Sequence, residues 1–255
     1  MLKNNYKVKA VLFDLDGTLA DTSPDMCASL NRVLVSHKLK TVDCMNLKKH
    51  ISRGALGVIE YASHVNGRDI DSSLLRSEFL DDYKNHPFIK TELNKDMDIL
   101  MNYLINKNII IGIVTNKHSR YVNKIIEGLG LTKKLSCVIT GDMVLNAKPA
   151  IDGLIKAAEE IQCDVNEIIY VGDDERDIIA GRDAGMTTVA ADFGFISADV
   201  NVRSWNSDLI IYNALELKNY IGPEIIVDQI SEFFKTGELQ GIHVVITAGP
   251  TREAL

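Results

Sequence analysis

Residues 9–22 read KAVLFDLDGTLADT, and the fold of the whole chain can be inferred outward from them. Ala10 to Phe13 are an unbroken apolar run, which is typical of a strand buried on both faces of a parallel sheet. The run stops at Asp14, so this carboxylate is expected at the carboxyl end of a strand, where open α/β sheets bind their ligands. Asp16 points to the same side if the backbone stays extended, because side chains repeat every second residue.

Two acids this close repel each other, and the repulsion is tolerable if a divalent cation binds or if one acid holds a proton. Both states suit chemistry at phosphorus, because a metal-clamped carboxylate is a nucleophile and a protonated neighbour is a general acid. Gly17 and Thr18 then supply a residue free of φ restriction and a hydroxyl donor, as a loop around a phosphate needs. An isolated pair of acids is most often a solvated turn, so the prediction depends on the full string DLDGT following a buried strand.

This string, residues 14–18, resembles the first motif of the haloacid dehalogenase-like phosphohydrolases. The resemblance implies a phospho-aspartate intermediate on Asp14, an acid–base role for Asp16, and a bound magnesium ion. Family members that remove halide or cleave a carbon–phosphorus bond lack an acid at the position of Asp16, so the resemblance excludes them. A phosphomutase uses both acids and stays an alternative.

The composition limits the possible partners. A chain of 255 residues with 46% hydrophobic residues can build one large domain or two modest ones around a sizeable core. The net charge of −7 argues against a nucleic-acid or anionic-membrane partner, which would need a concentrated basic face. No apolar stretch is long enough for a membrane span or an export signal, so we expect a cytoplasmic protein. The expected partner is a small phosphorylated metabolite, and the sequence leaves both a monomer and a homodimer open.

The four cysteines are scattered along the chain. Cys27, Cys44, Cys137 and Cys163 form no C-x-x-C pair and no zinc-like spacing with histidine. We therefore expect reduced, mostly packed thiols.

After the first strand the chain becomes helical in pattern. Ser23-Pro24-Asp25 is typical of a helix start, and apolar residues recur after it at helical spacing with no strand between them. This pattern predicts an α/β fold with a doubly wound parallel sheet and an inserted helical cap domain, which some members of the resembled family carry at this position. The expected parts are a catalytic core, residues 1–22 and 87–222, and a cap, residues 23–86, with hinges at 21–24 and 86–92.

Two further motifs follow in the expected core, after a helix predicted over residues 93–106. Residues 109–114 are a second buried strand, and Thr115 and Asn116 at its end resemble the second family motif, whose hydroxyl donates to a phosphate oxygen. Lys148 resembles the third motif, a lysine that neutralises the nucleophile and the transferring phosphoryl group. Taken alone, the threonine would be a helix cap and the lysine a surface charge. Many relatives read KPxP at the third motif, whereas this chain has KPAI.

A cluster of acids, GDDERD, follows the next apolar strand at residues 172–177. Such a cluster at a strand end supplies the oxygen ligands that magnesium prefers. It resembles the fourth family motif, GDxxxD, which is matched at Asp173 and Asp177, with Asp174 as an additional acid. The magnesium ligands implied by the resemblance are Asp14, the backbone carbonyl of Asp16, and Asp173, with Asp177 or Asp174 orienting the bound waters.

The expected activity is magnesium-dependent hydrolysis of a small phosphomonoester, and the competing interpretation is a non-catalytic binding protein on the same fold. Residues 170–196 resemble the phosphoglycolate phosphatase branch and its bacterial relative that acts on N-acetylmuramic acid 6-phosphate. Both candidate substrates carry a carboxylate. HISRGALGVIEYA, residues 50–62, resembles the substrate-specificity loop of this branch, so Arg53 and Gly54 are expected at the substrate. The alternative for Arg53 is one more exposed cation.

The end of the chain carries a different signal. Residues 239–255, LQGIHVVITAGPTREAL, resemble the opening of a phosphopantothenate–cysteine ligase domain and follow a predicted linker helix at 223–238. Seventeen residues cannot bury a core of their own, so we interpret this segment as a remnant or an added tail.

Overall fold

A computed structural model describes residues 8–67, 71–197 and 199–221 of the chain. The predicted linker helix and ligase-like tail, residues 223–255, lie outside the described residues. Within the described part, no helix has both the length and the apolar character that a membrane span requires.

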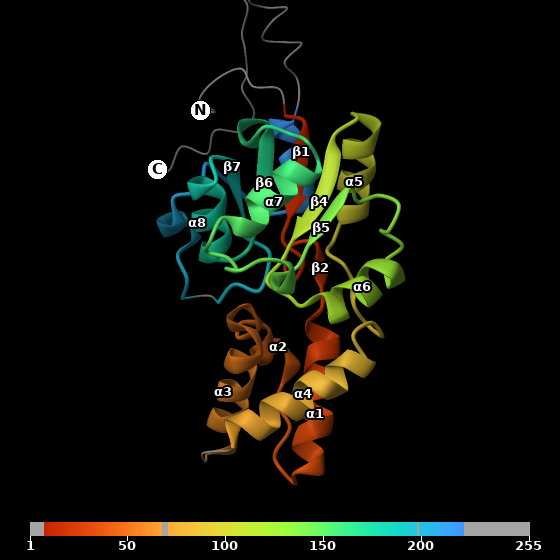
Figure 1. The fold of residues 1–255 in the computed structure, drawn as a ribbon. Helices are drawn as coiled ribbons and strands as arrows, with labels where there is room; N and C mark the ends of the chain where they lie inside the picture. The colour runs from red at the N-terminus through yellow and green to blue at the C-terminus, as the bar shows by residue number, and fades with distance from the viewer. Residues whose placement is uncertain (1–7, 68–70, 198, 222–255) are drawn as a thin grey trace, which may run out of the picture. The chain divides into compact units, whose positions relative to one another are not determined.

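A six-stranded parallel sheet forms the centre of the catalytic core (Figure 1). Its strand order is β5-β4-β1-β6-β7-β8, so the chain builds outward from β1 in one direction and then returns to build in the other. The strands are β1 (Ala10–Phe13), β4 (Ile110–Val114), β5 (Cys137–Ile139), β6 (Ile168–Gly172), β7 (Thr187–Ala191) and β8 (Leu209–Ile211). The predicted doubly wound sheet is therefore confirmed, and ligands of such sheets bind beside the strand at which the direction reverses.

Alternating side chains of β1 bury the two faces of the sheet. Val11 and Phe13 belong to the apolar cluster formed with α5, α6 and η5, whereas Ala10 and Leu12 belong to the cluster formed with α7 and α8. This explains the unbroken apolar run in the sequence, because a strand covered on both sides has no solvent face. The covering elements are α5 (Met97–Asn106), α6 (Ser119–Gly128), α7 (Asp152–Glu160), α8 (Glu175–Asp183) and the 3₁₀ helix η5 (Ala214–Tyr220).

The helix predicted over residues 93–106 begins later than expected. Glu92–Leu93 is a short strand, β3, that pairs antiparallel with β2 (Ala20–Asp21). Asp96 has a φ of 63°, in the left-handed region, and α5 starts at the next residue. Asn94 holds the intervening turn, because its amide donates to the carbonyl oxygens of Gly17 and Thr18 at 2.6 and 2.9 Å.

Four helices between β2 and β3 form the predicted cap (Figure 1). Their apolar faces pack into a cluster that includes Leu30, Ile59, Leu75 and Phe79 and that Tyr121 and Phe195 join from the core. The helices are α1 (Ser23–Ser36), α2 (Cys44–Lys48), α3 (Gly54–Asn66) and α4 (Ser72–Asn85), with the 3₁₀ turn η1 (Ile51–Arg53) before α3.

The two chain crossings between cap and core are fastened to each other by Asp25. This carboxylate is 2% exposed and accepts hydrogen bonds from the backbone amides of Ile89, Lys90 and Thr91 and from the Thr91 hydroxyl, at 2.8 to 3.0 Å. A buried carboxylate needs such partners, since an unpaired one would be costly to desolvate. The first turn of α1 thus holds the segment through which the chain returns to the core.

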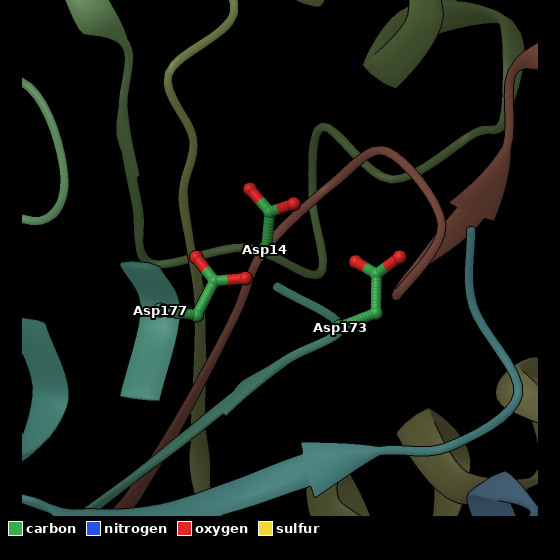
Figure 2. A group of neighbouring side chains, drawn as sticks. All are labelled: Asp14, Asp173 and Asp177. Carbon is green, nitrogen blue, oxygen red and sulfur yellow. The ribbon is translucent and has the colours of Figure 1, made fainter. Parts of the chain in front are cut away.

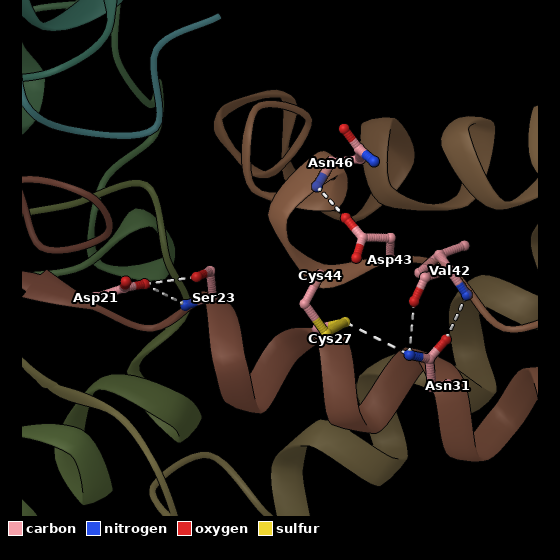
Figure 3. The surroundings of a disulfide bond; sticks show 8 residues. All are labelled: Asp21, Ser23, Cys27, Asn31, Val42, Asp43, Cys44 and Asn46. Atoms are coloured by element: carbon pink, nitrogen blue, oxygen red, sulfur yellow. Dashed lines mark hydrogen bonds between the residues drawn. A yellow bond between two sulfur atoms is a disulfide. The ribbon is translucent and has the colours of Figure 1, made fainter.

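The expectation of four reduced cysteines is wrong for two of them. Cys27 on α1 and Cys44 at the start of α2 form a disulfide (Figure 3). No spacing in the sequence indicated this pairing, but the packing of α2 against α1 brings the two Cα atoms to 5.5 Å, within the range that a disulfide spans. Cys137 and Cys163 are free thiols, as expected.

Candidate active site

Three buried carboxylates meet at the carboxyl end of the sheet (Figure 2). Asp14 directly follows β1, Asp173 follows β6, and Asp177 lies in the first turn of α8. Each offers a carboxylate oxygen, and these oxygens lie within 4.8 Å of one another. Since β1 and β6 are the neighbours between which the direction of winding reverses, the acids occupy the place where such sheets bind ligands.

Lys148 joins this cluster as its cation. Its ammonium group lies 2.8 Å from Oδ1 of Asp14 and 2.6 Å from Oδ1 of Asp177, and it also donates to the Tyr170 hydroxyl at 2.7 Å. The Asn116 side chain positions the lysine backbone through two bonds of 2.9 Å, one to its N–H and one to its carbonyl oxygen. The lysine and the nucleophile candidate are therefore in direct contact.

The pKa values of these groups reflect burial and mutual repulsion. Burial raises the pKa of Asp14, the Lys148 cation opposes that rise, and Asp177 and Asp16 add to it, with a result of about 6. Burial and the charges of Asp14 and Asp177 raise the pKa of Asp173 well above its ordinary value. Three carboxylates share one ammonium group, so the cluster holds more negative charge than the protein itself compensates.

Gly17 and Thr18, expected as a phosphate loop, lie against Asp173. The Thr18 hydroxyl donates to Oδ1 of Asp173 at 2.8 Å, and the Phe195 amide donates to Oδ2 at 2.7 Å. Gly17 has a φ of 88°, and a Cβ there would lie 2.2 Å from Oδ2 of Asp173. Both residues therefore help to fix the orientation of Asp173.

Asp16 lines the same cavity as the three-acid cluster but pairs with a different lysine. Its carboxylate accepts from Lys117 Nζ at 2.8 and 3.1 Å and from the Thr22 hydroxyl. Lys117 is itself buried and lies 4.7 Å from the ring centroid of Tyr83, a residue of the cap helix α4. Sequence reasoning did not single out Lys117, although it stands two residues after Thr115 at the same strand end.

Asp174 and Thr115 are two further motif residues that lie outside the three-acid cluster. Asp174 caps α8 and pairs with the Arg176 guanidinium at 2.7 Å, so Asp177 and not Asp174 joins the cluster. Thr115 is buried at the end of β4, where its hydroxyl oxygen accepts from the Lys117 amide at 3.2 Å. Its O–H therefore stays available as a donor toward the cavity that it lines.

A cavity of about 330 Å³ lies between these groups and the cap. The core side contributes the acids and lysines, and the cap side contributes η1, the start of α3, and one face of α4. Arg53 and Gly54 line the cavity as expected, but Arg53 is paired with Glu60 at 2.6 Å. Arg176 reaches across from the core and donates to the carbonyl oxygen of Ser52 in η1.

The chain matches a known protein family over the part that carries this site. A sequence model described as haloacid dehalogenase-like hydrolase matches residues 11–191, which span every group of the site. The chain belongs to the haloacid dehalogenase-like hydrolase family.

Proteins of similar sequence support the assignment of the chain to this family. The chain is 35% identical over 215 residues to an N-acetylmuramic acid 6-phosphate phosphatase of Pseudomonas putida, covering 84% of this chain and 96% of the relative. It is 34% identical over 204 residues to a phosphoglycolate phosphatase of Xanthomonas campestris, covering 80% and 91%. The fold is similar to the crystal structure of a predicted phosphoglycolate phosphatase from Haemophilus somnus, with a TM-score of 0.76, 20% identity, and coverage of 86% and 100%. The resemblance identified from the sequence motifs is confirmed.

Proposed function

We propose that this phosphatase hydrolyses a small phosphomonoester through a phospho-aspartate formed on Asp14. The observation that carries the proposal is the contact of 2.8 Å between Asp14 and the buried ammonium group of Lys148. The lysine holds the carboxylate in place and can neutralise an incoming phosphate dianion beside it. The substrate candidates are the compounds for which the relatives are named, N-acetylmuramic acid 6-phosphate and phosphoglycolate.

The cluster fits a magnesium ion. Asp14, Asp173 and Asp177 present carboxylate oxygens within 4.8 Å of one another, and Mg²⁺ prefers oxygen ligands. Burial, followed by the charges of Asp14 and Asp177, raises the pKa of Asp173, and a divalent cation would compensate the negative charge of these acids. When bound, magnesium would offset the repulsion between the phosphate and the carboxylates. The predicted ligands remain Asp14, the Asp16 backbone carbonyl and Asp173, with Asp177 orienting the bound waters.

The reaction has two steps in which Asp14 is first the nucleophile and then the leaving group. An oxygen of Asp14 bonds to phosphorus as the bond to the substrate alkoxide breaks, and Asp16 gives a proton to that alkoxide. Asp16 then takes a proton from the water that attacks phosphorus, which releases inorganic phosphate and restores the Asp14 carboxylate. Thr115 and Lys148 donate to the phosphoryl oxygens. Because the Asp16 carboxylate is paired with Lys117, this contact must give way to one with the leaving alkoxide or the attacking water before Asp16 can transfer a proton.

The first test is release of p-nitrophenol from its phosphate ester by the purified full chain. We expect turnover with Mg²⁺ and at least about a hundredfold less after chelation, since the phosphate would then meet uncompensated carboxylates. With a sugar phosphate as substrate, one inorganic phosphate should be released for each molecule of the ester that is consumed. Transfer of the phosphoryl group between sugar hydroxyls without free phosphate would instead identify a mutase, and no turnover of any ester would contradict the proposal.

A further inference from the structure

The cationic side chains on the cavity differ in whether an acid already neutralises them. Six lysine and arginine residues line the cavity. Four of them form ion pairs, namely Lys148 with Asp14, Lys117 with Asp16, Arg176 with Asp174, and Arg53 with Glu60. Arg76 and Arg120 form no ion pair and no side-chain hydrogen bond with any described residue. In an otherwise acidic protein, these are two uncompensated guanidinium groups on one cavity.

Arg76 and Arg120 approach the cavity from opposite parts of the molecule. Arg76 lies on the cap helix α4, and Arg120 lies in the first turn of the core helix α6. The Arg120 guanidinium lies 5.2 Å from the ring centroid of Tyr121. Burial raises the pKa of the Tyr121 hydroxyl, and the charges of Arg120, Lys117 and Arg76 lower it. Asp81 also acts on this hydroxyl but makes no ion pair with either arginine. The two guanidinium groups therefore share one neighbourhood around Tyr121.

This neighbourhood borders the phosphoryl site at Lys117, the partner of Asp16. The cation in contact with Asp14 is Lys148, at 2.8 Å. The cavity lining also includes the apolar side chains of Met26, Phe79 and Leu80. One cavity thus presents the acids and lysines of the phosphoryl site, apolar side chains, and two unpaired arginines.

We propose that Arg76 and Arg120 form a subsite for the carboxylate of a sugar-sized phosphomonoester. The inference deepens the proposed function and rests on it. Arginine forks match carboxylates in a bidentate geometry, and a carboxylate between them would remove the repulsion of the two like charges across the cap–core boundary. The cavity of about 330 Å³ is at the lower end of the ~300–1,000 Å³ typical of sites for larger ligands. A two-carbon ester would leave most of it open, so N-acetylmuramic acid 6-phosphate fits the subsite better than phosphoglycolate.

The subsite differs from the contact that the sequence suggested. Arg53 was expected to meet the substrate carboxylate, but its guanidinium already lies 2.6 Å from Glu60. A substrate that bound Arg53 would have to displace this acid, whereas Arg76 and Arg120 have no acid to displace. Selectivity for the carboxylate is therefore assigned to the unpaired arginines.

The test uses two sugar phosphates that differ by the lactyl carboxylate, N-acetylmuramic acid 6-phosphate and N-acetylglucosamine 6-phosphate, with Mg²⁺ present. Wild-type kcat/KM should favour the first by about tenfold or more, the scale of a charge-assisted contact. Arg76→Ala and Arg120→Ala should each raise KM for the first compound by about tenfold and leave KM for the second within about twofold. Arg203→Ala is the matched control, because Arg203 is exposed, makes no ion pair, and lies outside the cavity. This control should leave all constants unchanged.

The outcomes separate the subsite from the phosphatase chemistry. Equal losses on both sugar phosphates, no change on either, or a wild type without preference for the carboxylate would each overturn the subsite. Turnover of p-nitrophenyl phosphate reports on the proposed function alone. If that turnover is absent, calorimetric binding of the same two compounds takes its place: a preference for the carboxylate that Arg76→Ala abolishes supports the subsite, and equal binding overturns it.

Discussion

The two walls of the cavity handle charge in opposite ways. On the core side, Asp14, Lys148, Asp173 and Asp177 are each at most 9% exposed, and every one is bonded to a neighbour. On the cap side, the arginine side chains lie at the surface, and the Arg53 side chain is 61% exposed. Buried, mutually bonded groups have one geometry, which suits chemistry on a phosphoryl group that all substrates share. Exposed cations can adapt, which suits recognition of the part that varies.

The largest expected effect comes from replacing the nucleophile. Asp14→Asn keeps the shape of the side chain but removes its ability to attack phosphorus, so turnover of p-nitrophenyl phosphate should fall on the order of 10⁴-fold. Asp98→Asn, on the exposed face of α5, is the control and should leave turnover unchanged. A loss of less than about tenfold in the Asp14 variant would sink the nucleophile assignment.

Replacing Lys148 tests whether the buried acids Asp14 and Asp177 depend on this cation. Lys148→Met leaves Asp14 and Asp177 buried without their cation, so we expect a loss of about 3–5 kcal/mol in the free energy of unfolding, together with loss of turnover. Denaturant titration measures the first effect, and Lys133→Met, at an exposed lysine, is the control. A variant of normal stability would show that the two acids do not depend on the lysine.

Replacing Asp25, which joins the two chain crossings between cap and core, should have an intermediate effect on stability. Asp25→Ala removes the acceptor of three backbone amides and one hydroxyl, so the free energy of unfolding should fall by about 1.5–3 kcal/mol. Melting of the variant, compared with Asp98→Ala, measures this loss. An unchanged melting temperature would mean that the return segment, residues 89–91, is held by other contacts.

The smallest effect is expected at Arg53. Exposed ion pairs contribute about 0.2–1 kcal/mol, so Arg53→Ala should change stability by no more than that and should shift KM for a carboxylate-bearing substrate by less than about threefold. Steady-state kinetics of Arg53→Ala, measured alongside those of Arg76→Ala, test this prediction. A tenfold rise in KM for Arg53→Ala alone would return the specificity role to the loop that the sequence indicated.

The sequence by itself determined the sheet and the order of its chemical groups. Apolar runs that end in DLDGT and GDDERD are typical of buried parallel strands with polar ends, and the ends of parallel strands meet at one edge. The local pattern predicted Asp14 and the acids of GDDERD at strand ends, whereas Lys148 and the choice of Asp173 and Asp177 came from the resemblance to the family motifs. The structure places the three acids in one cluster, with Lys148 in contact with Asp14.

Only the tertiary structure decided what each neighbouring side chain contacts. The D-x-D spacing predicted that Asp16 would face the same side as Asp14, and both residues line the cavity. The spacing did not predict that Asp16 would pair with Lys117, a residue 101 positions away. Thr18 supports Asp173 across 155 positions, and Cys27 meets Cys44 because two cap helices pack together. Strand periodicity is a property of consecutive residues and is therefore visible in the sequence. Ion pairs and disulfides between distant segments depend on how the elements pack, and no local pattern records that.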